Sequence, residues 1–368
     1  MKSENILYVG KKYLSNPSGG REMLSALNYK AIKSIYNENL FSYEIFLNQP
    51  KVKESNFNFN VFSSKIDGLT KSSIRDIKEI IKTNNISKIF IDGSNLGLLA
   101  KEVKLSFSDI KIFTFFHNIE AKFFFDAFKR AKSFHSFGVF VANYFAEKKA
   151  TKYSDKIICL TKDDSKLLER IYRKTANFIL PLALEDQLFE PTIQKNHSNK
   201  KEKYVLFVGG LFYANEFGIK WFIKNVSPFI SFKTYIIGSG FEKFKDEFEK
   251  YKNVRVIGEV DELSSWYLDA QYIIAPIFEG SGMKTKVAEA FMFGKKILAT
   301  RSALAGYDNL PEYSYYLCNT SKEFIETIQS LVDSDYSNFD ENIRNIYENK
   351  FSLSSSQIIL RSILLGKN

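Results

Sequence analysis

Short apolar runs alternate with longer amphipathic segments along the first half of the chain. The runs are rich in Ile, Val and Phe, and the segments between them have helical periodicity. The runs predicted to be strands buried on both faces are 6–10, 88–93, 111–118, 156–161 and 177–182. This alternation predicts βαβ units that build a parallel sheet.

The same alternation begins again after a polar stretch without periodicity, EDQLFEPTIQKNHSNKKEK. The later runs predicted to be strands are 204–210, 234–240, 254–260, 272–277 and 295–300. We therefore expect an α/β protein of two doubly wound, Rossmann-like domains with a cleft between the carboxyl ends of their strands. The predicted parts are an N-terminal domain (1–185), a linker (186–203), a C-terminal domain (204–350) and a final helix (351–368) that packs back on the first domain.

Composition limits the class of protein. The chain has 368 residues, of which 45% are hydrophobic and 26% charged, as is typical of globular domains. Cys159 and Cys318 lie in apolar runs without a CxxC pattern, which predicts two buried free thiols in a reducing cytoplasm. Neither a signal peptide nor an uninterrupted run of about 18 apolar residues is visible, so a cytoplasmic location is expected.

Positive charge is concentrated in the first half of the chain. Residues 1–200 contain 32 Lys and Arg against 21 Asp and Glu, whereas the remainder contains 20 against 21. An asymmetry of this kind favours an anionic partner for the N-terminal domain, such as nucleic acid, a phospholipid surface or a phosphorylated substrate.

Glycines follow several predicted strands and precede predicted helices. Backbone amides at a helix N-terminus attract anions, and glycine leaves them accessible. The positions with this pattern are Gly19 and Gly20 before Arg21, Gly209 and Gly210, Gly238 and Ser239, and Gly280, Ser281 and Gly282. Turns between strands and helices also favour glycine for geometry alone, but four such turns in two domains indicate phosphate binding.

The segment EGSGMKTKVAEAFMFGKKILAT, residues 279–300, contains the most specific of these turns. Lys284 and Lys286 place positive charge near the predicted helix start, where it faces phosphates. Glu289 lies farther along the helix, where its carboxylate can accept two hydrogen bonds from the diol of a ribose. The segment therefore predicts a nucleotide site.

This segment resembles the donor site of glycosyltransferase family 4, the glycosyl transferases group 1, which have the GT-B fold. The resemblance extends to LFVGGLFYANEFGIKWFIKNVSPFI, YIIGSG and VIGEVDELSSWYLDAQYIIAPI, and to FHNIE and IICLTKDD in the first half. It implies that Glu289 holds the ribose, that Glu279, Gly280 and Gly282 contact the donor sugar, and that His117 contacts the sugar or its phosphate.

The sequence departs from the family pattern in two places. Nine residues separate Glu279 from Glu289, where the family usually has seven, which leaves the role of Glu279 open. The Arg and Lys that many members carry after the first strand of the second domain are absent from LFVGGLFYANEFG. Lys284 or Lys286 is expected to supply that charge, and Arg21 is a further candidate.

The resemblance implies a retaining glycosyltransferase that moves a sugar from a nucleoside-diphosphate donor to a glycan or lipid-linked acceptor in surface polysaccharide or glycoconjugate synthesis. We expect neither a cofactor nor a metal, since no HxH, HExxH or DxD motif is present. Three alternatives stay open: a non-hydrolysing sugar-nucleotide epimerase of the same fold, a basic nucleic-acid-binding protein, and a transferase relative that binds sugars without catalysis. No nucleic acid is expected as a partner, because the lysines are scattered and the glycine turns would have no role.

Residues 121–150 suggest a second partner. The phenylalanines are Phe123, Phe124, Phe125, Phe128, Phe134, Phe137 and Phe140, and the cations among them are Lys122, Lys129, Arg130 and Lys132. A basic helix rich in exposed Phe is typical of contact with an anionic membrane surface, here the inner face of the cytoplasmic membrane. The alternative is that the rings pack inside the N-terminal domain or between domains.

Overall fold

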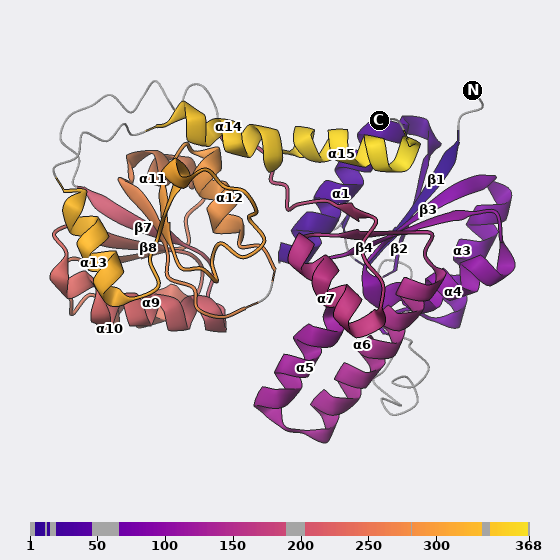
Figure 1. The fold of residues 1–368 in the computed structure, drawn as a ribbon, viewed down its shortest axis with the longest axis horizontal. Helices are drawn as coiled ribbons and strands as arrows, with labels where there is room; N and C mark the ends of the chain where they lie inside the picture. Colours follow the sequence, from indigo (N-terminus) through magenta and orange to yellow (C-terminus); the bar gives the residue numbers. More distant parts are fainter. Residues whose placement is uncertain are drawn as a thin grey trace. The chain divides into compact units, whose positions relative to one another are not determined.

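The computed structural model describes residues 4–11, 13–14, 20–45, 66–188, 203–280, 282–332 and 339–366. The chain divides into two compact units, each built on a parallel six-stranded sheet (Figure 1). Unit 1 comprises Met1–Leu182 and Ser356–Asn368, and unit 2 comprises Ala183–Ser355. The predicted α/β class with two Rossmann-like domains is confirmed. Most of the predicted linker lies outside the described residues.

Unit 1 contains the strands β1 (Asn5–Gly10), β2 (Leu40–Glu44), β3 (Ile86–Asp92), β4 (Lys111–Phe116), β5 (Lys156–Cys159) and β6 (Phe178–Ile179). Their order across the sheet is β2-β1-β3-β4-β5-β6. The helices are α1 (Gly20–Tyr36), α3 (Lys71–Thr83), α4 (Gly97–Ser106), α5 (Glu120–Ala131), α6 (Phe134–Tyr153) and α7 (Lys162–Tyr172), with 3₁₀ turns η1 (Asn37–Asn39) and η2 (Ser94–Leu96).

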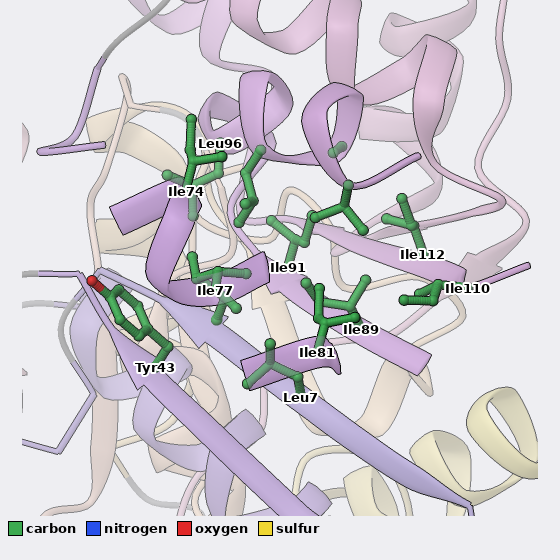
Figure 2. Packing of buried hydrophobic residues seen from close by; sticks show 14 of the residues in the cluster. Leu7, Tyr43, Ile74, Ile77, Ile81, Ile89, Ile91, Leu96, Ile110 and Ile112 are labelled. Carbon is green, nitrogen blue, oxygen red and sulfur yellow. The ribbon is translucent and has the colours of Figure 1, made fainter. Parts of the chain in front are cut away.

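The sheet of unit 1 is buried on both faces, as the near-continuous apolar strands predicted. Leu7 of β1 belongs to a cluster with Ile77 of α3 and Leu99 of α4, and Figure 2 shows how side chains of this cluster interdigitate. The neighbouring Tyr8 points to the opposite face, where its hydroxyl donates to the carbonyl of Ser25 in α1 at 2.9 Å. Alternate residues of one strand thus pack against different helices.

Unit 2 repeats the plan. Its strands are β7 (Tyr204–Val208), β8 (Lys233–Ile237), β9 (Val254–Gly258), β10 (Tyr272–Ala275), β11 (Ile297–Ala299) and β12 (Tyr315–Leu317), in the order β12-β11-β10-β7-β8-β9. The helices are α9 (Tyr213–Asn225), α10 (Lys245–Phe248), α11 (Ser264–Asp269), α12 (Thr285–Met292), α13 (Ser321–Ser330) and α14 (Glu341–Lys350), with 3₁₀ turns η3 (Ser227–Phe229), η4 (Phe241–Phe244) and η5 (Glu312–Ser314). Figure 1 shows α11 and α12 on one face of this sheet and α9 and α10 on the other.

The last helix, α15 (Leu353–Leu365), begins in unit 2, but its residues from Ser356 onward belong to unit 1. Leu360, Ile363 and Leu364 are buried there. The ammonium group of Lys88, in β3, donates to the carbonyl of Leu364 at 2.8 Å. The C-terminal helix therefore contributes to the core of the N-terminal unit.

Residues 121–150 form two helices where the sequence suggested one. The chain turns at Lys132, whose φ is 47°, and Ser133 begins α6 by exchanging hydrogen bonds with Ser136 in a capping box. In Figure 1 the resulting α5–α6 hairpin extends away from the sheet of unit 1. Of α5, only Glu120 and Ala121 are buried.

Two further expectations can be compared with the structure. Cys159 and Cys318 are both free and buried, as predicted. In the described part of the chain, no helix is long and apolar enough to span a bilayer.

Candidate functional site

The glycine turns after β7 and β8 lie against each other in unit 2. The amide of Leu211 donates to the carbonyl of Ser239 at 2.9 Å, and the amide of Gly209 donates to the carbonyl of Ile237 at 2.9 Å. At Gly238, φ is 144°, and a Cβ atom would stand 2.1 Å from the carbonyl oxygen of Gly209. Only glycine permits this approach, so the structure brings Gly209, Gly210, Gly238 and Ser239 together at the carboxyl edge of the sheet.

The side chain of Lys286, on α12, reaches the turn after β7. Its Nζ atom lies 2.7 Å from Oδ1 of Asn215 and 4.5 Å from the centre of the Phe207 ring, and a Cβ atom on Gly209 would be 3.1 Å from it. Burial lowers the pKa of Lys286 to about 7, although the nearby charge of Glu289 opposes this shift. An amine thus occupies the turn in which the sequence has no Arg or Lys.

Glu289 is half-buried on the same helix, and Tyr267 of α11 fixes its carboxylate. The Tyr267 hydroxyl donates to Oε2 of Glu289 at 2.7 Å. Burial and the charge of Glu289 raise the pKa of Tyr267 well above its ordinary value, so the hydroxyl remains a donor. The sequence identified Glu289 but not Tyr267, and its only signal was an aromatic pair before β10.

Lys284 forms hydrogen bonds with the loop that precedes α12. Its ammonium group donates to the carbonyls of Gly280 at 3.2 Å and Gly282 at 2.7 Å. Its own carbonyl accepts a hydrogen bond of 2.7 Å from the hydroxyl of Tyr307. Glu279 is exposed on this loop. Ser281 lies outside the described residues.

In unit 1, His117 follows β4 and is 7% exposed. Its Nε2 atom lies 3.3 Å from Oδ2 of Asp92 and 3.4 Å from Oγ of Ser25. Burial alone would raise the pKa of Asp92, but His117, Ser25 and Asn28 together lower it below its ordinary value. Because one ring nitrogen faces both the acid and the hydroxyl, the three residues do not form a nucleophilic triad, in which each nitrogen has a separate partner.

Gly20 begins α1 and is exposed, whereas the side chain of Arg21 is engaged within unit 1. Its Nη2 atom lies 3.1 Å from Oδ2 of Asp67 and 2.9 Å from Oδ1 of Asn95, and its Nη1 atom lies 3.6 Å from Oε1 of Glu120. Burial works against ionisation of Asp67, but Arg21 and Lys11 lower its pKa. Gly19 lies outside the described residues.

The buried carboxylate of Glu147, on α6, binds the first backbone amides of α5. Its oxygens accept hydrogen bonds from the amides of Glu120 at 3.0 Å and Ala121 at 3.2 Å, and from the hydroxyls of Ser94 and Tyr172, each at 2.9 Å. Burial raises the pKa of Glu147 and that of Glu120 to about 7 each. In the described ranges, no group of three or more His, Cys, Asp or Glu side chains is arranged to hold a metal.

Comparison with known proteins identifies the type of enzyme. The family model for Glycosyl transferases group 1 matches residues 202–334. Two O-antigen biosynthesis glycosyltransferases of Escherichia coli, WbnH and the probable WbiN, are each 24% identical to this chain over 295 residues, which cover 79% of this chain and 80% of theirs.

Solved structures share the whole fold. Sucrose-phosphate synthase from Thermosynechococcus elongatus superimposes with a TM-score of 0.71 at 14% identity, and Anabaena HepE in complex with UDP superimposes with a TM-score of 0.67 at 11% identity. Each comparison covers 99% of this chain and 100% of the other. At these identities the likeness shows the fold, which is GT-B. Residues 202–334 of this fold match the model of the glycosyl transferases group 1, and the chain is a glycosyltransferase.

Proposed function

We propose that this glycosyltransferase moves a sugar from a nucleoside-diphosphate donor to a glycan or lipid-linked acceptor. In this proposal unit 2 binds the donor, unit 1 binds the acceptor, and the anomeric configuration of the sugar is retained. The relatives named for O-antigen biosynthesis support a role in surface polysaccharide synthesis. The structure of HepE with UDP supports a nucleotide as the leaving group.

The placement of Lys286 carries the proposal. Its amine lies in the turn between β7 and α9, beside backbone amides that glycine leaves accessible, and it is held by Asn215 rather than by a carboxylate. The negative charge of a diphosphate bound at this turn would stabilise the protonated amine of Lys286 and so raise its pKa. Glu289, oriented by Tyr267, is then available to the ribose diol with its remaining lone pairs.

Retention requires attack on the face that the diphosphate leaves. In this scheme the bond between the anomeric carbon and the diphosphate oxygen breaks, the acceptor oxygen bonds to the same face, and the hydroxyl proton passes to the leaving diphosphate. The charge that grows on the diphosphate needs electrostatic stabilisation. We therefore expect replacing Lys284 and Lys286 together by Ala to lower turnover more than donor affinity, as steady-state kinetics beside direct donor binding would show.

Proton uptake tests the assignment of Lys286. Above pH 7.5 Lys286 is mostly neutral in the free enzyme. Binding of a nucleoside diphosphate should therefore be accompanied by the uptake of one proton by Lys286. The affinity for the diphosphate should then fall about tenfold per pH unit up to pH 9. Calorimetry in buffers of different ionisation enthalpy, with UDP, GDP and ADP as probes, measures both quantities. Lys286→Met should abolish the pH dependence, and Lys322→Met, on the exposed face of α13, should leave it unchanged. A flat profile for the wild type would refute the assignment.

We also propose that unit 1 contacts an anionic membrane surface through the α5–α6 hairpin, on the inner face of the cytoplasmic membrane. At its turn Phe134 is 98% exposed, and Phe137 and Phe145 on the same side of α6 are 47% and 44% exposed. Lys129 and Lys132 lie exposed beside them. Rings and cations together suit the boundary between lipid headgroups and acyl chains.

Co-sedimentation tests the membrane contact. We expect the protein to bind vesicles of phosphatidylcholine with phosphatidylglycerol at low salt, and to be released by salt. Changing Lys129, Arg130 and Lys132 to Glu should abolish binding. The same change at Lys71, Arg75 and Lys82 of α3 is the matched control in unit 1 and should have a smaller effect. If the wild type stays in the supernatant with anionic vesicles, an acceptor free in solution is the better assignment.

A further inference from the structure

Asn215, in the first turn of α9, links the glycine turn after β7 to Lys286. Its Nδ2 atom donates to the carbonyl of Gly210 at 2.8 Å, and its Oδ1 atom accepts from Nζ of Lys286 at 2.7 Å. A Cβ atom on Gly209 would stand 2.9 Å from Nδ2, so a side chain at that position would displace Asn215. One amide side chain therefore joins α9, the turn and α12.

The carbonyl of Gly210 determines which end of the Asn215 amide faces Lys286. A carbonyl oxygen only accepts hydrogen bonds, so the NH₂ group lies against Gly210, and the reversed amide would bring two oxygens together. The group that remains for Lys286 is an uncharged acceptor. A lysine amine can donate to such an acceptor whether it is protonated or neutral, so Asn215 holds the amine in place without supplying a charge.

The charges around Lys286 lie on α12 or directly before it. Burial lowers the pKa of Lys286 to about 7, Glu289 opposes this shift, and Lys284 adds to it. From β7 the amine meets the ring of Phe207, with Nζ 4.5 Å from the ring centre, and from α9 it meets Asn215. Neither of these two groups carries a charge, so the protonation of Lys286 depends on what else enters the turn.

A neutral acceptor at this position has a chemical consequence. A carboxylate in place of the amide would keep Lys286 charged through an ion pair and would repel a diphosphate. Glu216, the next residue of α9, is instead paired with Lys220 at 2.7 Å. Resting on the proposed nucleoside-diphosphate donor, we propose that Asn215 is a positioning residue, which holds the amine of Lys286 at the turn after β7 and leaves the diphosphate to provide its counter-charge.

Two variants separate the two properties of this side chain. Asn215→Asp keeps its size and replaces the neutral acceptor by a charged one, whereas Asn215→Leu keeps its size and removes both hydrogen bonds. Asn225→Asp is the matched control, because Asn225 ends the same helix and donates to the carbonyl of Trp221 at 2.8 Å, away from the turn. Thermal melting of unit 2 checks that each variant folds.

The amine of Lys286 can be titrated without nucleotide. In NMR spectra of protein labelled with ¹³C at the lysine Cε atoms, Lys286 gives the signal that Lys286→Met lacks. This signal should titrate near pH 7 in the wild type and in Asn225→Asp, and about one to three pH units higher in Asn215→Asp. An equal midpoint in Asn215→Asp and the wild type, or a wild-type midpoint near the ordinary 10.5, would overturn the proposal.

Calorimetry with UDP, GDP and ADP tests the effect on binding. At pH 8.5 the wild type and Asn225→Asp should take up about one proton per bound nucleotide, and Asn215→Asp close to none. Asn215→Leu should keep the uptake but bind about tenfold more weakly, because its amine is no longer held at the turn. A merely structural side chain would lower affinity in both variants without changing proton uptake.

The two measurements fail separately. If the wild type binds none of the nucleotides, the proposed donor is wrong, yet the lysine titration still decides whether Asn215 controls the charge of Lys286. If nucleotides bind, wild-type affinity in a folded Asn215→Leu protein, or wild-type proton uptake in a folded Asn215→Asp protein, would overturn the role of Asn215 while the donor assignment stands.

Discussion

Single side chains in this protein take their chemistry from partners that are distant in sequence. Lys286, Glu289 and His117 were predicted from the sequence by their motifs. Their partners Asn215, Tyr267 and Asp92 were not, because they lie 71, 22 and 25 residues away and belong to other elements. A motif identifies which residue type is needed at a turn, whereas its rotamer and pKa depend on packing that no local pattern contains.

Glu289→Ala tests the ribose assignment. Removing the carboxylate leaves the ribose hydroxyls unpaired and should weaken nucleoside diphosphate binding by roughly 1.5 to 3 kcal/mol, which is about tenfold to more than a hundredfold. Isothermal titration with UDP, GDP and ADP measures this loss. Glu326→Ala, an exposed carboxylate of α13, serves as the control and should bind as the wild type does. Unchanged affinity in a folded Glu289→Ala protein would place the ribose elsewhere.

The strands that have a continuous apolar run were predicted correctly from the sequence. All ten predicted strands overlap a strand of the structure, while β2 and β12 were missed. LFSYE and YYL lie at sheet edges and are half-buried, so neither sequence has the continuous apolar run of an inner strand. The break between α5 and α6 was also missed, although Ser133 and Ser136 provide its capping signal.

The hairpin depends on Glu147 at its base. Replacing the Glu147 carboxylate by the amide of Gln should destabilise unit 1 by about 1 to 3 kcal/mol, since an NH₂ group would face amide and hydroxyl donors. The first amides of α5 should then exchange faster with solvent, which hydrogen-exchange mass spectrometry over residues 120–131 measures. Glu102→Gln, at the surface beside Lys78, is the control. Equal protection of α5 in both variants would contradict the anchoring role.

Over the whole molecule, the two units should respond to pH in opposite directions. Glu120 and Glu147 have folded pKa values of about 7, above the ordinary value of 4.5, so unit 1 loses stability as pH rises from about 4.5 through 7. Lys286 and Lys295 have folded pKa values of about 7, below the ordinary 10.5, so unit 2 gains stability as pH rises from about 7 to 10.5.

Calorimetry between pH 5 and pH 9 should therefore show the two melting transitions moving in opposite senses. Each buried carboxyl group contributes at most about 3 kcal/mol to the change in unit 1. Both tryptophans, Trp221 and Trp266, lie in unit 2, so indole fluorescence follows that unit while circular dichroism follows both. If both transitions shift together, the titrating groups are not those named here.

The division of α15 between the units has a consequence for recombination. The chain leaves unit 1 after Leu182 and returns to it at Ser356, so unit 2 is inserted into unit 1. A chimaera that borrows unit 2 from another protein must be spliced at both crossings, because a single crossover would pair unit 1 with a foreign C-terminal helix. Such a hybrid would carry mismatched side chains at Leu360 and Leu364, inside the half that its designer meant to leave intact.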